Sequence, residues 1–331
     1  MSCWQELTIR LKQEIVELLD YGSRCNLRLC SSSDRYTVDS TKIIGKELKI
    51  SETTSEMAEG KTIIRLDIDT FTIWFIGREN VTRIDRGWNG EIIEGFSETI
   101  QRNRYEVIAE FLKRFTRKGF VWVNTIHVKS TNFPVPETWN IKCANLKLYN
   151  LKEHYLGWLQ KFVTLCQTFK KLEILCWGNE TECSVLLAQI KVKKSMKIGH
   201  NLDFTDEQLD QVEAMDLKIL SLNFTIEAVK KRLEKFLKYG KKSDELNLFT
   251  PYHEFVFTQD QLIPKELIVK RIKMLNEQEG EYNGHIIGGF ENVHGIQDRR
   301  EIHYINYGQS IRIRCRVYEK PERSDCTMYP F

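Results

Sequence analysis

The chain has 331 residues, with 49 Lys and Arg against 46 Asp and Glu, so its formal net charge is +3. A charge this close to zero gives no general reason to expect nucleic acid or an anionic membrane as the partner. Hydrophobic residues make up 41% and charged residues 29%, which is ordinary for a globular protein, and the length favours about two domains. The 6 prolines and 18 glycines are too few for long low-complexity linkers.

The N-terminal segment carries charges where a signal peptide needs an apolar core, among them Glu6, Arg10 and Lys12. No window approaches the roughly 20 apolar residues of a membrane-spanning helix. The 9 cysteines are an odd number without a C-x-x-C spacing, which argues against a disulfide framework or a structural zinc site. We therefore expect reduced thiols, no membrane partner, and a protein of the cytoplasm or the nucleus, or both.

Residues 1–42 are predicted to form a small unit of three short helices. The first has an apolar face whose members recur at helical spacing: Leu7, Leu11, Ile15, Leu18 and Leu19. We place the N-cap of the second helix at Ser23, and the start of the third within 31–34. The second helix has four apolar members: Cys25, Leu27, Leu29 and Cys30. A unit this small has little core of its own, so it should lean on a partner or on the rest of the chain.

Residues 43–130 form a second segment, whose composition changes along its length. The polar stretch 41–60 is interpreted as a connector or a pair of weak strands. Residues 61–76 are rich in β-branched and aromatic side chains, which predicts two strands with a tight turn near Asp67 and Asp69. A helix is expected over about 103–118, where the apolar residues follow helical spacing.

The third segment, 131–266, carries most of a repeated pattern that begins just before it. Strand-like triplets start at Ile126, Leu146, Leu172, Met196, Leu220 and Leu246, so the starts are 20, 26, 24, 24 and 26 residues apart. Amphipathic stretches follow several triplets, at 155–166, 185–190, 208–215 and 226–237. A strand–helix unit that repeats every 20 to 29 residues or so is the period of leucine-rich repeats, and Asn150 occupies the Asn position of that pattern. An ordinary α/β sheet with regular loops is the alternative.

The expected fold class is therefore α/β, with the small helical unit followed by an irregular leucine-rich-repeat-like strand–helix solenoid and a C-terminal β-hairpin. The last five triplets are predicted to be neighbouring parallel strands, because the gaps between them are long enough for crossovers. The polar residues that alternate with buried Leu and Ile would then form a substrate-binding face: Lys147, Glu173, Lys197, Ser221 and Asn247.

Residues 267–331 are interpreted as a C-terminal cap. The stretch 267–275 fits a last helix or strand, and the glycine-rich stretch 282–295 fits a loop. Residues 301–306 and 309–318 are predicted to form a hairpin. In its second strand apolar residues alternate with Arg312, Arg314 and Arg316. This row of arginines is either a solvated face that discourages edge pairing or a binding site for an acidic or phosphorylated substrate segment.

Sequence motifs of catalysis are missing. No G-x-S-x-G, H-E-x-x-H, Walker A or Rossmann glycine pattern occurs, and the 7 histidines show no metal-ligand spacing. Asp67 and Asp69 are expected to be solvated carboxylates beside a turn, and Cys30 a packed thiol. The basic stretch 230–242 is expected to be a solvated helix face above a core stripe, an acidic or RNA partner being the alternative. We expect neither an enzyme nor a bound cofactor or metal.

The N-terminal unit resembles an F-box, a motif that opens with Leu-Pro, continues through an amphipathic helix to a Leu-Asp turn, and ends after a short Leu-rich helix. The corresponding positions here are Leu7-Thr8, 15–19, Asp20, 25–29 and Cys30-Ser31. The string DYGSRCNLRLCSSSDR is similar to the F-box proteins expanded in nematodes, in which an F-box-associated domain with strand–helix repeats follows the box. Thr8 replaces the usual Pro, which should weaken the start of the helix.

The resemblance implies an adaptor of a cullin-type (SCF) ubiquitin ligase. The F-box would dock on the Skp-type linker subunit of the cullin complex, and the rest of the chain would bind a protein substrate. The linker-binding residues that it implies are Leu7, Leu11, Ile15, Leu18, Leu19, Leu27 and Cys30. The alternative function is a repeat-type protein-binding scaffold unrelated to ubiquitination. No nucleic acid partner is expected.

Overall fold

The protein is described by a computed structural model that covers residues 3–55, 61–78, 80–93, 95, 97–116, 121–130, 135, 139–151, 154–176, 180–221, 223–241, 243–251, 272–274, 283–291, 297–306 and 310–318. Two compact units divide the chain: unit 1 comprises Met1–Phe169 and Ile174–Asn179, and unit 2 comprises Lys170–Glu173 and Glu180–Phe331. This division differs from the four segments drawn from the sequence.

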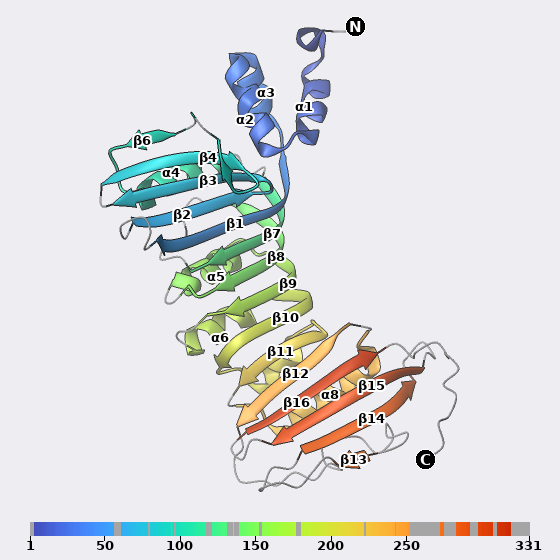
Figure 1. The fold of residues 1–331 in the computed structure, drawn as a ribbon. Coiled ribbons are helices and arrows are strands. Elements are labelled where there is room, and N and C mark those ends of the chain that lie inside the picture. The colour runs from blue at the N-terminus through green and yellow to red at the C-terminus, as the bar shows by residue number, and fades with distance from the viewer. Residues whose placement is uncertain are drawn as a thin grey trace, which may run out of the picture. The chain divides into compact units, whose positions relative to one another are not determined.

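Unit 1 begins with the helical unit, residues 3–40, in which the three predicted helices are present (Figure 1). They are preceded by a short 3₁₀ turn: η1 (Trp4–Glu6), α1 (Ile9–Leu18), α2 (Tyr21–Cys30) and α3 (Ser32–Ser40). The N-cap predicted for the second helix is wrong by three residues. Asp20, not Ser23, is the N-cap, and its Oδ1 accepts a hydrogen bond from the Ser23 backbone N–H at 2.7 Å. Asp caps a helix as well as Ser does, so α2 begins directly after Asp20.

The strand order in unit 1 is β5-β4-β3-β2-β1-β7-β8, followed by β9, whose residues Lys170–Glu173 belong to unit 2. β1 is antiparallel to β2 and parallel to β7, and β7 is parallel to β8. The strands that precede α4 are β1 (Ile43–Ser55), β2 (Lys61–Ile68), β3 (Phe71–Arg78), β4 (Val81–Trp88), β5 (Glu91–Ile92) and β6 (Glu98–Ile100). The later elements are α4 (Arg104–Thr116), β7 (Val121–Lys129), β8 (Ile141–Tyr149), α5 (Tyr155–Thr164) and β9 (Thr168–Leu175).

The sequence interpretation of 41–60 is wrong for its described part. Residues 43–55 form one long strand, β1, in which Leu48 and Ile50 are buried and Lys49 between them is exposed. This short alternation is a strand signal that the surrounding polar residues concealed. The turn between two strands near Asp67 and Asp69 and the helix over 103–118 are both confirmed.

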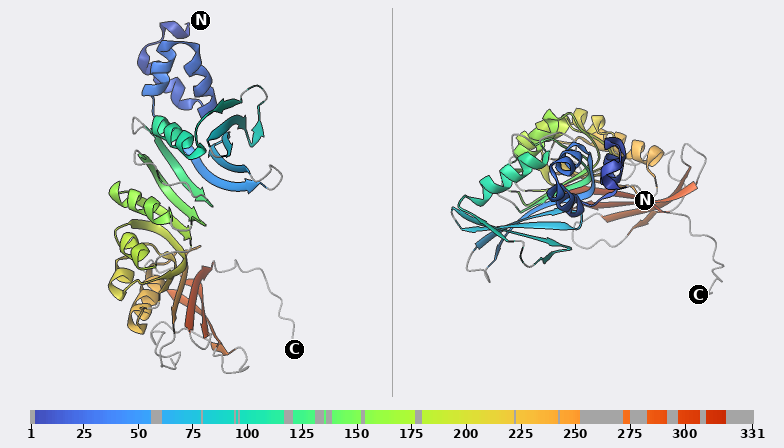
Figure 2. Two further views of the ribbon diagram at one scale, coloured as in Figure 1. Left: turned by 90° about the vertical axis from the view of Figure 1, so that its left-hand side faces the viewer. Right: turned by 90° about the horizontal axis from the view of Figure 1, so that it is seen from above.

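Helices α4 and α5 cover one face of the unit 1 sheet (Figure 2). α4 contributes Ile108 and Leu112 to the core, and α5 contributes Trp158, whose ring meets that of Trp139 edge-on at 4.9 Å between centroids. All four side chains are almost completely buried. Burial of large aromatic groups is the main source of stability in such a core, so the sheet and its helices form a firm base.

Two successive strands of unit 1 end in the same way. Ser130 after β7 and Asn150 after β8 have positive φ angles of 49° and 51°. The backbone N–H of Ser130 donates to Tyr149 O at 2.8 Å, and that of Asn150 donates to Leu175 O at 3.0 Å. Asn tolerates this left-handed conformation well. Asn150, which the sequence placed at the Asn position of a leucine-rich repeat, therefore serves a recurring turn at the strand ends.

Unit 2 has the strand order β10-β11-β12-β16-β15-β14-β13. β10, β11 and β12 are parallel neighbours, and β12 pairs with β16 antiparallel. The elements up to β12 are α6 (Glu180–Ala188), β10 (Lys191–Leu202), α7 (Asp206–Gln211), β11 (Asp216–Ser221), α8 (Ile226–Tyr239) and β12 (Glu245–Pro251). The remaining strands are β13 (Ile272–Met274), β14 (Asn283–Glu291), β15 (Gln297–Asn306) and β16 (Ser310–Tyr318).

The predicted triplets lie in strands β7 to β12, except that Leu222 is outside the described residues. The helices predicted at 155–166 and 226–237 correspond to α5 and α8, whereas the stretch 185–190 covers only the end of α6, which already begins at Glu180. The stretch 208–215 was placed too late: α7 spans Asp206–Gln211, because Thr205 caps it and forms a capping box with Gln208.

α8 has the expected solvated face over a core stripe, with one exception. Leu233, Phe236 and Leu237 of the expected core stripe are buried, as predicted. Arg232, counted among the solvated cations, is also buried and donates hydrogen bonds to the backbone carbonyls of Val212 and Ala214. Burial lowers the pKa of Arg232 to about 10. This arginine therefore ties the helix to the segment before β11.

The C-terminal hairpin is confirmed, since β15 and β16 pair antiparallel from Asn306 and Ile311 outward. The loop predicted at 282–295 is wrong for 283–291, which form strand β14 between β13 and β15. The sheet supplies hydrogen-bond partners on both sides, and this outweighs the low strand propensity of glycine. Of 267–275, residues 272–274 form a strand, and the others lie outside the described residues. No helix in the described part of the chain is long and apolar enough to cross a membrane.

Candidate functional site

The apolar stripe of α1 faces solvent. Leu11, Ile15 and Leu18 are 46%, 39% and 87% exposed. The opposite side of the helix packs inward, because Val16 is buried and Gln13 Nε2 donates to Ser40 Oγ of α3 at 3.1 Å. An apolar stripe at helical spacing normally faces a core, so this one lacks the neighbour that its pattern requires.

The other two helices add further exposed apolar side chains. Leu29 of α2 is 76% exposed and Tyr36 of α3 is 66% exposed. The exposed apolar set of the helical unit consists of Ile9, Leu11, Ile15, Leu18, Leu29 and Tyr36. Sequence reasoning did not assign Ile9, Leu29 or Tyr36 to linker binding, because they fall outside the spacing of the first apolar face.

The other linker-binding residues that the resemblance implies differ in their exposure to solvent. Leu7, Leu19 and Leu27 are half-buried. Cys30, predicted to be a packed thiol, is exposed instead, because it lies in the last turn of α2, where the chain turns toward α3. The structure thus places Leu11, Ile15, Leu18 and Cys30 on the surface and the other three partly inside.

Polar contacts hold the helical unit together. The Trp4 indole N–H donates to Asp34 Oδ1 at 2.7 Å, and Arg28 forms a two-pronged ion pair with Asp39 at 2.7 and 3.3 Å. The hydrogen bonds from Trp4 and Ser31 hold the pKa of Asp34 below its ordinary value. These contacts join η1 and α2 to α3. They do not use the side chains of the exposed apolar set, which therefore remain available to a partner.

Thr8 supports the start of α1. It is the N-cap residue, and its Oγ1 accepts a hydrogen bond from the Leu11 backbone N–H at 3.4 Å. Proline pre-sets the backbone at a helix start, whereas threonine satisfies one of the N–H groups left without a partner there. The replacement of Pro therefore exchanges one helix-starting device for another.

Arg24 joins the end of α1 to the start of β1. Its guanidinium is buried and donates to the backbone carbonyls of Glu17, Leu19 and Lys42 at 3.2, 3.1 and 2.8 Å. Burial lowers the pKa of Arg24, the nearby Glu17 and Asp20 opposing it, but arginine stays charged in proteins. Arg24 thereby fixes the point at which the chain passes from the helical unit into the sheet.

Replacing Arg24 by Met should destabilise unit 1 by about 2 kcal/mol, since three carbonyls lose a charged donor inside the protein. Chemical denaturation of the purified chain measures the effect. Arg10→Met is the matched control, because Arg10 lies on an exposed helix surface and forms its ion pair with Glu14, which is also exposed. Equal stability of the two variants would contradict the assigned role.

One side of α2 packs on the chain's own sheet. The Tyr21 ring contacts those of Phe71 and Phe115 at 5.5 and 5.3 Å between centroids. An added Cβ on Gly22 would lie 1.9 Å from the Trp88 ring, so only glycine fits there. The helical unit therefore leans on the rest of unit 1 through α2, while Leu11, Ile15 and Leu18 of α1 remain exposed to solvent.

The predicted substrate-binding residues are only partly on the surface. Lys147, Glu173 and Lys197 are half-buried, and Lys197 Nζ forms an ion pair with Asp216 Oδ2 at 3.3 Å. Ser221 and Asn247 are buried, which corrects their assignment.

The Ser221 side chain lies on the buried face of β11, whereas the prediction placed it on the exposed face. In β11 the buried side chains are those of Leu217, Ile219 and Ser221, so the triplet was read one residue out of register. The Ser221 hydroxyl donates to Phe204 O at 2.8 Å and supports the chain after the strand. Asp216 and Lys218 occupy the half-exposed face instead.

The arginine row of β16 lies in register with the polar face of its neighbours. Arg314 is opposite Asn247 in β12 and His303 in β15, and Asn247 is in turn opposite Lys218 in β11. Lys218 is opposite Lys197 in β10. Because cross-strand partners share a face, these positions form one row across the sheet of unit 2 that is mainly basic.

Within the described residues no group of three or more His, Cys, Asp or Glu side chains could hold a metal ion. Asp67 and Asp69 do not converge. Asp69 Oδ1 accepts from the backbone N–H groups of Lys46 and Glu47 at 2.7 and 2.8 Å, and Asp67 Oδ1 accepts from Arg65. The two carboxylates are therefore structural, not merely solvated beside the turn.

The described part of the chain is thus a mixed α/β protein with a three-helix N-terminal unit and an uncovered apolar surface on it. In comparisons with known proteins, no family model, no curated protein and no solved structure matches the chain.

Proposed function

We propose that the protein is an F-box-type adaptor of a cullin ubiquitin ligase, in which the helical unit docks on the Skp-type linker subunit and the rest of the chain binds a protein substrate. The observation that carries the proposal is the uncovered α1 stripe. Three helix-spaced apolar residues, Leu11, Ile15 and Leu18, face solvent. Exposed apolar surface of this kind marks a protein-binding site.

The resemblance of 7–31 to an F-box selects the linker as the partner. The linker-binding residues that the resemblance implies are all exposed or half-buried in the structure. The exposed apolar set also contains an aromatic residue, Tyr36, and aromatic residues are enriched in protein interfaces.

Direct binding tests the proposal. Purified full-length chain is titrated with recombinant Skp-type linker subunit in a calorimeter, and a one-to-one complex with submicromolar dissociation constant is the expected result. A chain that is folded by circular dichroism and shows no heat of binding at micromolar concentration excludes the adaptor. A repeat-type protein-binding scaffold then becomes the better assignment.

The sheet and helices that follow the helical unit are proposed to be an irregular, leucine-rich-repeat-like recognition domain. The recurring strand-end turns at Ser130 and Asn150 and the parallel strands β10, β11 and β12 support a repeated strand–helix unit. The row formed by Lys197, Lys218 and Arg314 favours an acidic or phosphorylated substrate segment, since guanidinium groups bind such oxygens in pairs.

Changing Arg312, Arg314 and Arg316 together to Gln should weaken binding of a fluorescent phosphoserine- and Glu-rich peptide about tenfold at low salt, as three positive charges are lost from β16. Fluorescence anisotropy measures the affinity. The matched control changes three exposed lysines of β10 in the same unit, Lys191, Lys193 and Lys194, to Gln. If the arginine variant folds normally and binds the peptide as tightly as the control does, the row is only a solvated face.

A further inference from the structure

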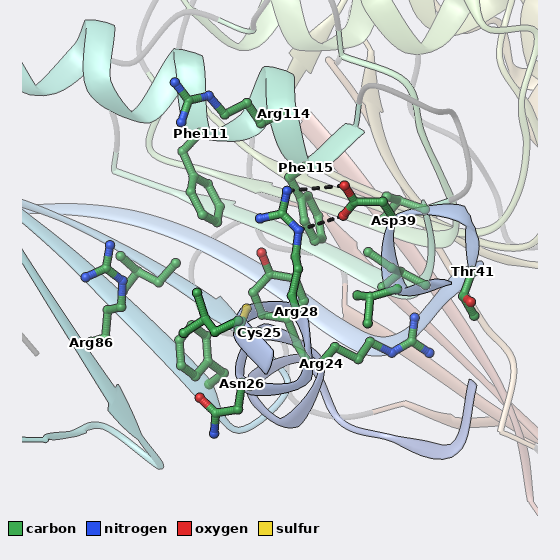
Figure 3. A pocket seen from close by; sticks show the side chains of 18 of the residues that line it. Arg24, Cys25, Asn26, Arg28, Asp39, Thr41, Arg86, Phe111, Arg114 and Phe115 are labelled. Atoms are coloured by element: carbon green, nitrogen blue, oxygen red, sulfur yellow. Dashed lines mark hydrogen bonds and ion pairs between the residues drawn. The ribbon is translucent and has the colours of Figure 1, made fainter. Parts of the chain in front are cut away.

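A hollow of about 870 Å³ lies inside unit 1, between the helical unit and the sheet. Its lining comes from α2, α3, α4 and strands β1, β3, β4 and β7 (Figure 3). Pockets that hold small organic molecules have volumes of roughly 300–1,000 Å³, and a gap left by ordinary side-chain packing is far smaller. The size alone therefore places this hollow among ligand pockets.

Fixed contacts surround the hollow. At one end Gly22 of α2 lies directly against the Trp88 ring, and Tyr21 packs on Phe71. At another point Arg24 binds the carbonyl of Lys42, where the chain enters β1. These contacts hold α2 at a set distance from the sheet, so the hollow does not simply close by a shift of the helix.

The body of the hollow is apolar and rich in aromatic side chains. Phe71, Ile73 and Val121 line it from the sheet, and Phe111 and Phe115 line it from α4. The two α4 rings stack with 6.2 Å between centroids. Aromatic and aliphatic walls of this kind favour a ligand with an apolar body.

The charged side chains that line the hollow are mainly positive. It contains four arginines, Arg24, Arg28, Arg86 and Arg114, and one carboxylate, Asp39. Arg28, Arg86 and Arg114 belong to the lining and come from three different elements, α2, β4 and α4 (Figure 3). Arg114 is also ion-paired with Glu110 of its own helix. Positive charge beside an apolar cavity attracts an anion, and a guanidinium binds carboxylate or phosphate oxygens through paired N–H groups.

Two of these arginines retain donors for a ligand. A guanidinium has five N–H donors. The ion pair with Asp39 involves two nitrogens of Arg28, and the contact with Glu98 Oε2 at 3.2 Å involves one nitrogen of Arg86. Both guanidinium groups also act on the thiol of Cys25 in the lining, whose pKa burial nevertheless raises. The thiol is therefore protonated at neutral pH.

We infer that this hollow is a binding site for an amphipathic organic anion, with an aromatic or aliphatic body among Phe71, Phe111 and Phe115 and its acidic group at Arg28, Arg86 and Arg114. Such a ligand would bridge the helical unit and the sheet, and so fix the orientation of the exposed apolar set. Ligand binding at this site does not require the linker subunit, so the site can be tested separately from the adaptor function.

Anilinonaphthalene sulfonate is a suitable probe, because it combines an aromatic body with one anionic group and fluoresces in apolar surroundings. Titration of the full chain should reveal one site with micromolar affinity. Its uncharged relative phenylnaphthylamine should bind at least about tenfold more weakly. The variant Leu18→Asp should leave the signal unchanged, which distinguishes the hollow from the exposed apolar set.

The charge requirement is tested with the double variant Arg86→Gln and Arg114→Gln, which should weaken probe binding about tenfold. The matched control is the double variant Arg65→Gln and Arg102→Gln. It removes the same net charge from ion-paired arginines of unit 1 that do not line the hollow.

Modification of Cys25 gives an independent readout. The probe should slow its reaction with a maleimide, measured by mass spectrometry of the Cys25 peptide, while the exposed thiols Cys3, Cys30 and Cys166 react at the same rate with and without it. The inference is overturned if the probe does not bind, if it leaves Cys25 unprotected, or if both double variants bind it equally.

Discussion

Replacement of Leu18 by Asp is expected to weaken binding to the Skp-type linker subunit by about 100-fold or more. Leu18 is 87% exposed at the end of the α1 stripe, so the folded chain tolerates the carboxylate, but a partner that covers the stripe would bury it. An unpaired charge buried in an interface costs several kcal/mol, more than a lost apolar contact does. Calorimetric titration of the full-length variant measures the loss.

The matched control is Val185→Asp, which makes the same kind of change at an exposed apolar position of α6 in unit 2. This variant should bind the linker as the original chain does. Both variants should unfold within about 0.5 kcal/mol of the original, since exposed substitutions rarely affect stability. A Leu18→Asp variant that binds with unchanged affinity would remove α1 from the docking surface.

Substitution of Gly22 by Ala is expected to destabilise unit 1 by about 3 kcal/mol. The added Cβ would lie 1.9 to 2.7 Å from three atoms of the Trp88 ring, and real Cβ atoms do not approach that closely. Trp88 is itself held edge-on against Phe71 at 5.2 Å between centroids, so it has little freedom to move away. Overpacking of this kind typically costs a few kcal/mol.

Two further variants isolate the cause. Gly157 of α5 is also a helical glycine, but its added Cβ would meet only Val135 Cγ1, at an ordinary 3.7 Å. Gly157→Ala should therefore stabilise the chain by about 0.5 to 1 kcal/mol, as alanine favours helix. The double variant Gly22→Ala and Trp88→Leu should lose less stability than the two single changes added together, because the clash disappears. Additive losses measured by denaturation would show that Gly22 does not act through Trp88.

The local elements of the protein were largely determined by the sequence. The α1 stripe, the strand triplets and the apolar side of α8 each follow one period, 3.6 or 2 residues, that short-range sterics impose on the backbone. For the same reason the hairpin of β15 and β16 could be predicted from the alternation around Arg312, Arg314 and Arg316. Leu11, Ile15 and Leu18 were identified as one face of a helix by spacing alone.

Only the tertiary structure decided what those faces meet. Periodicity shows that Leu18 shares a face with Leu11, but a buried and an uncovered stripe have the same spacing, so its exposure depends on where α3 packs. The face of β11 on which Ser221 lies and the burial of Asn247 in β12 both depend on the neighbouring strands. A one-residue shift in the pairing of a strand exchanges its buried and exposed faces, so the sequence pattern alone does not fix them. Gly22 against Trp88, the carbonyls bound by Arg24, and the arginines around the hollow join residues far apart in the chain. Such contacts leave no periodic trace in a sequence, because they arise only when separate elements pack together.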